Sequence, residues 1–126
     1  MIDIEIKTPD EETLRSASQL PKPKGYKLLV ALPEFEEKTD GGIFIPGKVL
    51  ESEQTASIVG FVLKMGDIAY GDEKKFPTGP WCNVGDWVLF RAYSGTRIKI
   101  HGKEFRLIND DSIEAVVEDP RGIRRA

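Results

Sequence analysis

The chain has 126 residues, of which 40% are hydrophobic and 31% are charged, and its net charge at pH 7 is −3. This length predicts one domain with extensions, large enough to bury a core without a metal or a disulfide. A negative net charge gives no indication of the basic face that a nucleic-acid-binding protein needs, and a single cysteine excludes an internal disulfide framework. The sequence shows no apolar run of membrane-spanning length and no signal peptide at its start, so we expect a cytoplasmic protein.

The first residues predict an appendage to the domain. Isoleucines alternate with acidic residues over 2–6, which predicts a short strand or extended arm. A capping threonine and a proline at the first helical position predict a short helix over 9–18. The sequence PKPKG over 21–25 is typical of a stiff polar linker. We therefore assign residues 1–21 to an N-terminal extension.

Most of the remaining chain predicts short strands separated by turns. The expected strands cover residues 26–32, 57–64, 87–92, 97–100, 104–108 and 112–117. Within the second strand, Gly60 is expected to form a β-bulge, and His101 with Gly102 to turn a hairpin. Residues 68–83 match no element. Frequent turns and almost no helical periodicity predict an all-β fold, a small closed or partly open β-barrel.

Residues 34–55 form a long polar segment that displays three consecutive large apolar residues. The triplet is Ile43, Phe44 and Ile45, and the expected hinges beside it are Gly41, Gly42, Pro46 and Gly47. The charged flanks are unable to bury enough apolar surface to stay ordered alone, and glycines permit sharp turns. We interpret the triplet as a hydrophobic plug on a mobile loop, which orders when it finds a partner's groove. A short central strand of the barrel is the alternative.

No motif nominates a catalytic centre. Residues 42–48 match the spacing of a P-loop, but Val49 stands where a Ser or Thr would hold magnesium. His101 has no partner nearby in sequence, and Cys82 has no neighbouring base, which favours a turn residue and a half-buried structural thiol. We expect no enzymatic activity, no metal and no cofactor.

Basic and aromatic residues raise a nucleic-acid binder as another hypothesis. The basic residues near the C-terminal hairpin are Arg91, Arg97, Lys99, Lys103 and Arg106. The aromatic residues on predicted strands are Tyr26, Phe61, Trp87, Phe90 and Phe105. Acidic residues elsewhere offset the basic group, so we favour a solvated strand face for it and core packing for the aromatic residues.

The sequence resembles the GroES-type co-chaperonins. In the family's order, the matching stretches are a strand over 27–30, the loop sequence GGIFI over 41–45, a returning strand over 56–63, the box VGDWVLF over 84–90, the turn YSG over 93–95 and a closing strand over 111–117. The resemblance spans about residues 22–118, which it makes one barrel domain. A tail over 119–126 follows.

The resemblance implies a homo-oligomeric ring, a heptamer, in which each subunit's closing strand helps to join a neighbour. It implies that Ile43, Phe44 and Ile45 dock in a groove of a GroEL-type chaperonin and cap its chamber over an unfolded client protein. The chaperonin binds and hydrolyses ATP, and the cap needs no cofactor. Neither nucleic acid nor membrane is an implied partner.

Three features depart from the ordinary bacterial pattern: the N-terminal extension, the Pro/Gly/Trp segment over 65–86 where the family has a roof hairpin, and the longer tail. They look like the bacteriophage-encoded co-chaperonins, which would act in the host cytoplasm, with phage capsid proteins as possible clients. An oligomeric phage structural or assembly protein that docks by the same loop is the alternative.

Overall fold

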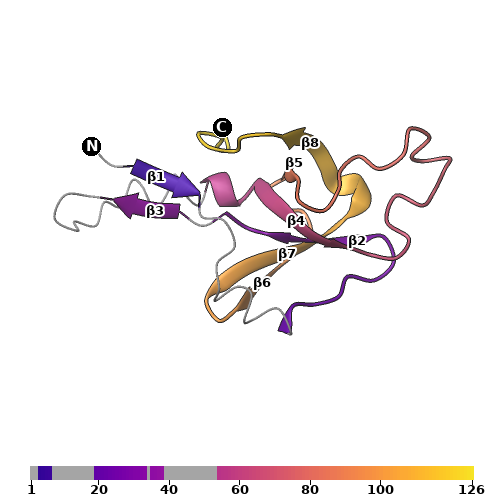
Figure 1. Ribbon diagram of the computed structural model, residues 1–126, viewed down its shortest axis with the longest axis horizontal. Coiled ribbons are helices and arrows are strands. Elements are labelled where there is room, and N and C mark those ends of the chain that lie inside the picture. The colour runs from indigo at the N-terminus through magenta and orange to yellow at the C-terminus, as the bar shows by residue number, and fades with distance from the viewer. Residues whose placement is uncertain (1–2, 7–18, 34, 39–53) are drawn as a thin grey trace.

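The computed structural model describes residues 3–6, 19–33, 35–38 and 54–126, and within them it is almost entirely β-structure (Figure 1). A two-stranded sheet pairs β1 (Asp3–Ile6) with β3 (Phe35–Lys38). A six-stranded sheet contains β2 (Lys27–Ala31), β4 (Val59–Met65), β5 (Trp87–Phe90), β6 (Thr96–Ile100), β7 (Lys103–Asn109) and β8 (Ile113–Val117). A 3-10 turn, η2 (Asp110–Ser112), joins β7 to β8. The predicted all-β class is confirmed.

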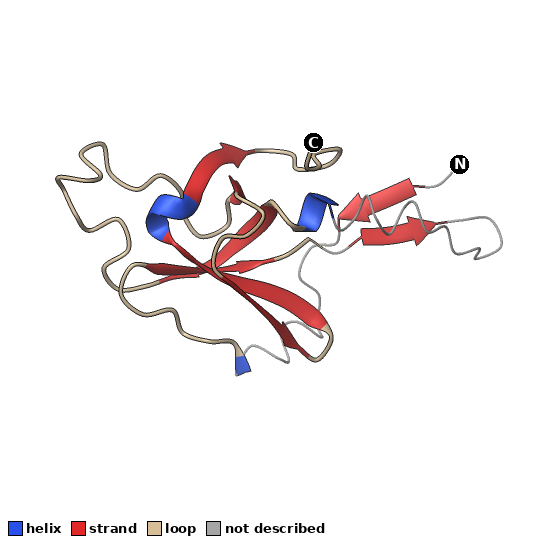
Figure 2. Ribbon diagram, turned by 180° about the vertical axis from the view of Figure 1, so that it is seen from behind, coloured by secondary structure: helices blue, strands red, loops and turns tan. Residues whose placement is uncertain are grey.

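The larger sheet is antiparallel throughout, in the order β6-β7-β2-β4-β5-β8. Figure 1 shows β6 and β7 on one side of the central pair β2 and β4, and β5 and β8 on the other. Seen from behind in Figure 2, the strands of this sheet cross at steep angles, as expected for a sheet that twists strongly over few residues.

The core lies along β2 and its neighbours. Leu28 and Val30 are fully buried, and they join Val62, Phe90 and Ile108 in one apolar cluster. In β5 the exposed fraction alternates, with every second residue buried, because successive side chains of a strand point to opposite faces. All six predicted strands of the barrel are confirmed, with bounds that differ by up to about two residues.

The expected β-bulge at Gly60 is wrong. Gly60 pairs in register with Val88, and the extra residue of β4 is Leu63, since Leu29 lies opposite Lys64 while Val30 lies opposite Val62. Gly60 instead permits close packing. A Cβ atom there would lie 2.8 Å from Val30 Cγ2 and 2.9 Å from Phe90 Cε1.

The start of the predicted loop is also different from the expectation. Residues 35–38 form β3, which pairs in antiparallel register with β1, Asp3 opposite Lys38 and Ile6 opposite Phe35. The pairing joins residues that lie 29 to 35 positions apart in the chain, so local composition gave no sign of it. The predicted strand near the N-terminus is confirmed, and the predicted helix over 9–18 lies outside the described residues.

No helix in the described part of the chain is both long and apolar enough to cross a membrane.

Candidate functional site

The connection between β2 and β4 is far longer than the fold requires. The two strands pair directly as antiparallel neighbours, and two to five residues commonly suffice to join such a pair. Here residues 32–58 join them. Long connections of this kind in small domains are usually functional, so this one is the candidate site.

The residues that follow β2 are held against the barrel by burial and by a backbone hydrogen bond. Leu32 is buried, and its backbone N–H donates to the carbonyl oxygen of Glu104 on β7 at 3.1 Å. Pro33 after it is also buried. The chain then forms β3, whose partner is β1. The outgoing end of the connection is therefore held by two different parts of the molecule.

The chain rejoins the barrel through a short helical turn over residues 54–56. The hydroxyl of Ser57 donates to the carbonyl oxygen of Gln54 at 3.0 Å. The backbone N–H of Ile58 donates to the carbonyl oxygen of Thr55 at 3.1 Å. The carbonyl oxygen of Ile58 in turn accepts from Phe90 on β5 at 3.0 Å. This turn is buried at Thr55, Ala56 and Ser57, so it is part of the core.

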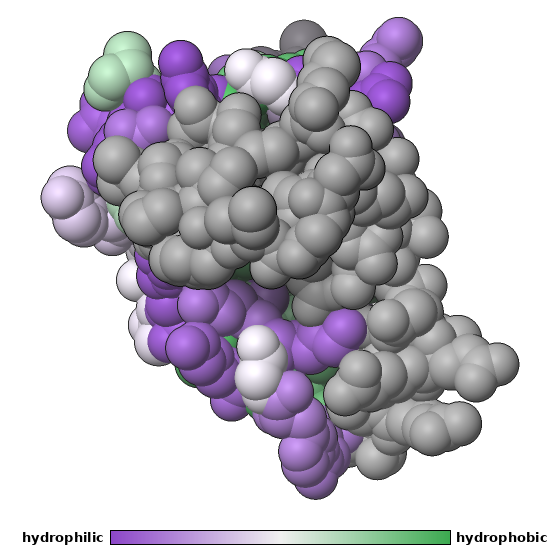
Figure 3. All heavy atoms as spheres, turned by 90° about the vertical axis from the view of Figure 1, so that its left-hand side faces the viewer, coloured by the Kyte–Doolittle hydropathy of each residue, from purple (hydrophilic) through white to green (hydrophobic). Residues whose placement is uncertain are grey.

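The predicted site residues lie between these two ends. The apolar triplet Ile43, Phe44 and Ile45, the hinges Gly41, Gly42, Pro46 and Gly47, and the P-loop-like stretch 42–48 are all outside the described residues. Figure 3 views the molecule from the side of β1 and β3, where the visible described residues are mostly hydrophilic. The structure therefore describes the residues on either side of the 39–53 segment, and the predicted site residues lie within that segment.

Residues 66–86 form an ordered lobe between β4 and β5, which includes the stretch 68–83 that matched no element in the sequence. Its aromatic rings pack edge to face, with centroids 4.8 Å apart for Tyr70 and Phe76 and 4.9 Å apart for Phe76 and Trp81. Phe76 is buried, whereas Trp81 is 42% exposed. Aromatic packing therefore holds the middle of the lobe, while backbone hydrogen bonds from Gly66 to Lys27 and from Gly85 to Val62 hold its two ends.

Asp110 at the end of β7 anchors this lobe. The backbone N–H of Tyr70 donates to Asp110 Oδ2 at 3.0 Å, and the Tyr70 hydroxyl donates to the Asp110 carbonyl oxygen at 2.8 Å. The same hydroxyl lies 3.4 Å from Cys82 Sγ. Burial raises the pKa of Tyr70 and the pKa of Cys82 above their ordinary values. Cys82 is 1% exposed, so the thiol is structural, as predicted, and more deeply buried than expected.

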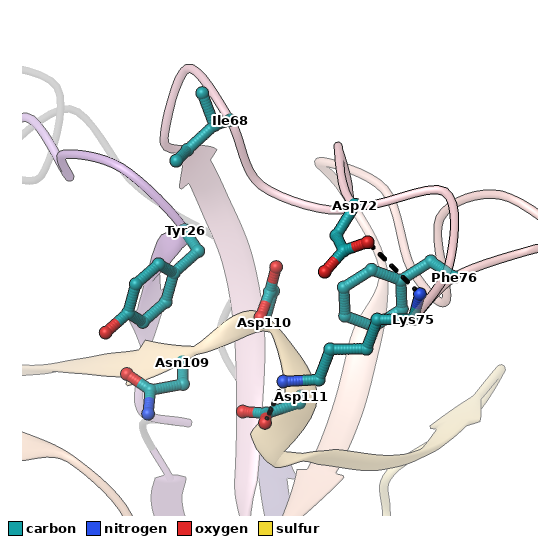
Figure 4. A pocket seen from close by; sticks show the side chains of 8 residues that line it. All are labelled: Tyr26, Ile68, Asp72, Lys75, Phe76, Asn109, Asp110 and Asp111. Atoms are coloured by element: carbon teal, nitrogen blue, oxygen red, sulfur yellow. Dashed lines mark hydrogen bonds and ion pairs between the residues drawn. The ribbon is translucent and has the colours of Figure 1, made fainter.

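A shallow pocket of about 320 Å³ opens beside the lobe (Figure 4). Its polar groups are already engaged, since Lys75 Nζ lies 2.6 Å from Asp111 Oδ2 and Asp110 accepts from Tyr70. The hydrogen bond to Asp111 raises the pKa of Lys75. The described residues hold no group of three or more His, Cys, Asp or Glu side chains placed to bind a metal ion.

Most of the basic residues near the C-terminal hairpin lie beside acidic residues or are buried. Arg97 pairs with Glu104 at 2.5 Å and Arg91 lies 4.0 Å from Glu114. The prediction of a solvated side chain is wrong for Arg106, which is fully buried. Its guanidinium lies 4.8 Å from the Phe90 ring centroid and donates to the carbonyl oxygen of Ala92 at 2.9 Å. The acidic partners of Arg91 and Arg97 and the burial of Arg106 disfavour the nucleic-acid hypothesis.

Two other expectations can be compared with the structure. His101 lies at φ 50° and Gly102 at φ 80° between β6 and β7, which confirms the hairpin turn.

Core packing of the aromatic residues is confirmed for Phe90 and Phe105, but Tyr26 is 49% exposed and does not belong to the core. Phe61 and Trp87 are partly buried and pack on each other, with ring centroids 5.1 Å apart.

Comparison with known proteins places most of this chain in one group of sequences. The model of the family described as "Chaperonin 10 Kd subunit" matches residues 21–117. The chain is 38% identical over 97 residues to a protein named Co-chaperonin GroES from Clostridium novyi (strain NT), and to one of the same name from Clostridioides difficile. A third, from Alkaliphilus metalliredigens, is 36% identical. Each alignment covers 77% of this chain and 97% of the relative.

Proposed function

Because this chain belongs to the chaperonin 10 Kd subunit family, that of the GroES co-chaperonins, we propose that it caps a GroEL-type chaperonin by docking Ile43, Phe44 and Ile45. The chain is a co-chaperonin that forms an oligomeric ring with other copies of itself. It is not an enzyme and needs no cofactor, since ATP acts through the chaperonin. The observation that carries the docking proposal is the long connection over 32–58 between two directly paired strands.

The energetics favour docking by several copies at once. Burying three large apolar side chains contributes about 5 to 8 kcal/mol, at about 1.5 to 3 kcal/mol each. Ordering some 15 residues of free chain costs on the order of 15 kcal/mol. One segment alone would therefore bind weakly. In a ring the first contact raises the effective concentration of the others, and the set binds tightly while each contact stays reversible.

The finer assignments are part of the same proposal. We propose a heptamer, joined in part through β8, which forms an edge of the sheet within the described residues and exposes Val116. The cytoplasm is the proposed place of action. Residues 1–20 and 118–126 lie outside the family match, which supports a divergent member. Phage origin, with the host's cytoplasm and capsid clients, stays a prediction.

Substitution of the central apolar residue tests the docking proposal. Phe44→Asp places a charge that would have to be desolvated in an apolar groove, so we expect a loss of chaperonin binding of at least about a hundredfold in the presence of nucleotide. Val84→Asp is the matched control, because Val84 is also an exposed apolar residue, at 58%, and lies outside the proposed segment. Both rings should assemble normally.

Two outcomes would count against this function. Undiminished capping by Phe44→Asp would exclude the docking role of the triplet. Stable association of the wild-type protein with a partner oligomer regardless of nucleotide would favour the alternative, a phage structural or assembly protein.

A further inference from the structure

Two segments outside the family match meet the two ends of the 39–53 segment. The family match covers residues 21–117, so β1 and the tail over 119–126 both lie outside it. β1 pairs with β3, which ends at Lys38. The tail contacts the helical turn over 54–56. Each end of the segment is thus flanked by a part of the chain that aligned relatives do not match.

The contact at the outgoing end is a strand pairing in continuous register. All four residues of β3 stand opposite residues of β1, so the backbone is fixed as far as Lys38. A two-stranded sheet alone is only marginally stable in water. Its value here is local, because it fixes the four residues that lead into the 39–53 segment.

The contact at the returning end joins the tail to a buried turn. Thr55 is 7% exposed, and its hydroxyl donates to the carbonyl oxygen of Ile123 at 2.6 Å. The backbone N–H of Arg125 donates to the carbonyl oxygen of Gln54 at 3.2 Å. Pro120 is buried in the described structure. Figures 1 and 2 both show the C-terminal end of the chain lying beside this short helical turn.

The tail also makes contacts within itself. The side chain of Arg121 forms a two-pronged contact with Asp119, at 3.0 Å from Nε to Oδ1 and 2.9 Å from Nη2 to Oδ2. This contact lowers the pKa of Asp119. The N–H of Ile123 donates to the carbonyl oxygen of Pro120 at 3.2 Å, which closes a turn. The carbonyl that Thr55 contacts is therefore presented by a folded tail.

We propose that β1 and the 119–126 tail are a pair of braces that fix both ends of the docking segment and thereby strengthen the binding of the cap to its chaperonin. Residues ordered before binding need not be ordered during it, so the entropy lost on docking is smaller. In a ring the gain is repeated at every subunit. This inference rests on the proposed function, because it assumes that residues 39–53 carry the docking triplet.

The test uses full-length protein with one variant for each brace and a matched control for each. Ile4→Pro with Glu5→Pro removes two successive backbone donors of β1, one of which faces β3, because the N–H groups of successive strand residues point to opposite edges. Ile4→Val with Glu5→Gln keeps both donors. Thr55→Val removes the hydroxyl that contacts the tail, and Thr55→Ser restores one. Native mass spectrometry verifies that every ring is intact.

Two measurements are made on each ring. Amide hydrogen exchange at residues 35–38 and at Arg125 reports the braces without any chaperonin. Affinity for a GroEL-type chaperonin with ADP reports the consequence. We expect faster exchange at the affected brace and at least tenfold weaker binding for the proline and Thr55→Val variants, and neither change for the two controls.

Faster amide exchange at the braces with undiminished affinity for the chaperonin would overturn the proposal and leave the proposed function intact. Amides of β3 and Arg125 that exchange as fast in the wild type as in the variants would also overturn it, because no brace would then exist. Failure of the wild-type ring to bind the chaperonin at all would instead refute the proposed function, and the inference with it. Phe44→Asp, measured beside them, marks the complete loss of docking.

Discussion

Tyr70 and Asp110 hold each other by two hydrogen bonds, 3.0 Å from the Tyr70 backbone N–H to the carboxylate and 2.8 Å from the Tyr70 hydroxyl to the Asp110 carbonyl oxygen. The first residue belongs to the lobe over 66–86, and the second to the turn between β7 and β8. The pair thus ties the lobe to the strand proposed to join neighbouring subunits. Loss of these two hydrogen bonds would therefore loosen both the lobe and the turn that leads into β8.

Removing the Tyr70 hydroxyl should destabilise the fold measurably. Tyr70→Phe leaves the Asp110 carbonyl oxygen without this donor in a buried site, so we expect the free energy of unfolding to fall by about 1–2 kcal/mol. Urea denaturation at one fixed protein concentration measures it, since ring assembly contributes to apparent stability. Tyr26→Phe is the control, at a tyrosine that is 49% exposed, and should change the value by less than about 0.5 kcal/mol. Equal effects of the two substitutions would show that the contact is unimportant.

A methyl group at Gly60 should be poorly tolerated. Its Cβ would lie within 2.9 Å of atoms of Val30 and Phe90, and overpacking of this kind costs about 1–3 kcal/mol. Thermal denaturation of Gly60→Ala measures the loss. Combining Gly60→Ala with Val30→Ala removes the nearest atom, so the two losses should be less than additive. Strict additivity would mean that Val30 does not limit this position.

Arg106 should contribute far more stability than the other arginine of the same hairpin. Arg106 is buried beneath the carbonyl oxygens of the turn after β5, and hydrogen bonds from a charged donor contribute about 1.5–3 kcal/mol. Arg106→Met should lose an amount in that range. Arg97→Met, at a partly exposed ion pair, should lose about 0–1 kcal/mol. Paired chemical denaturation curves decide the order, and a larger loss for Arg97→Met would contradict this account.

Stability should decline in alkaline solution. Burial raises the pKa of Tyr70 above its ordinary value of 10.0 and the pKa of Cys82 above 9.0. The unfolded chain therefore releases protons that the folded protein retains, so this contribution is complete below about pH 9 and is lost as the pH rises further. The Tm at ~pH 8 and ~pH 10.5 measures the decline. Tyr70→Phe with Cys82→Ala should flatten it, and an unchanged slope would show that other groups cause the decline.

The barrel was predictable because its strands carry a local signal. In β5 and β8, apolar and β-branched residues stand between glycine and aspartate turns, and each strand can be identified without its neighbours. The length and composition of the 34–55 segment likewise mark it as unusual without any contact information.

The remainder depends on contacts between distant residues. β3 is a strand because β1 pairs with it, and the lobe over 66–86 is ordered because Tyr70 reaches Asp110. Arg106 was misplaced because both it and Phe105 are buried, although successive strand residues point to opposite faces. On a strand covered on both faces, the sequence pattern does not show that both sets of side chains are buried. The positions of Ile43, Phe44 and Ile45 lie outside the described residues, so their docking role stays a prediction.

Native mass spectrometry of the purified protein, alone and with a GroEL-type chaperonin plus ATP or ADP, is the most direct test of the proposed function. We predict a homo-oligomeric ring that joins the chaperonin only when nucleotide is present, because the partner's grooves must change for weak contacts to act together. A monomer, or a ring that ignores the chaperonin under every nucleotide condition, would contradict it.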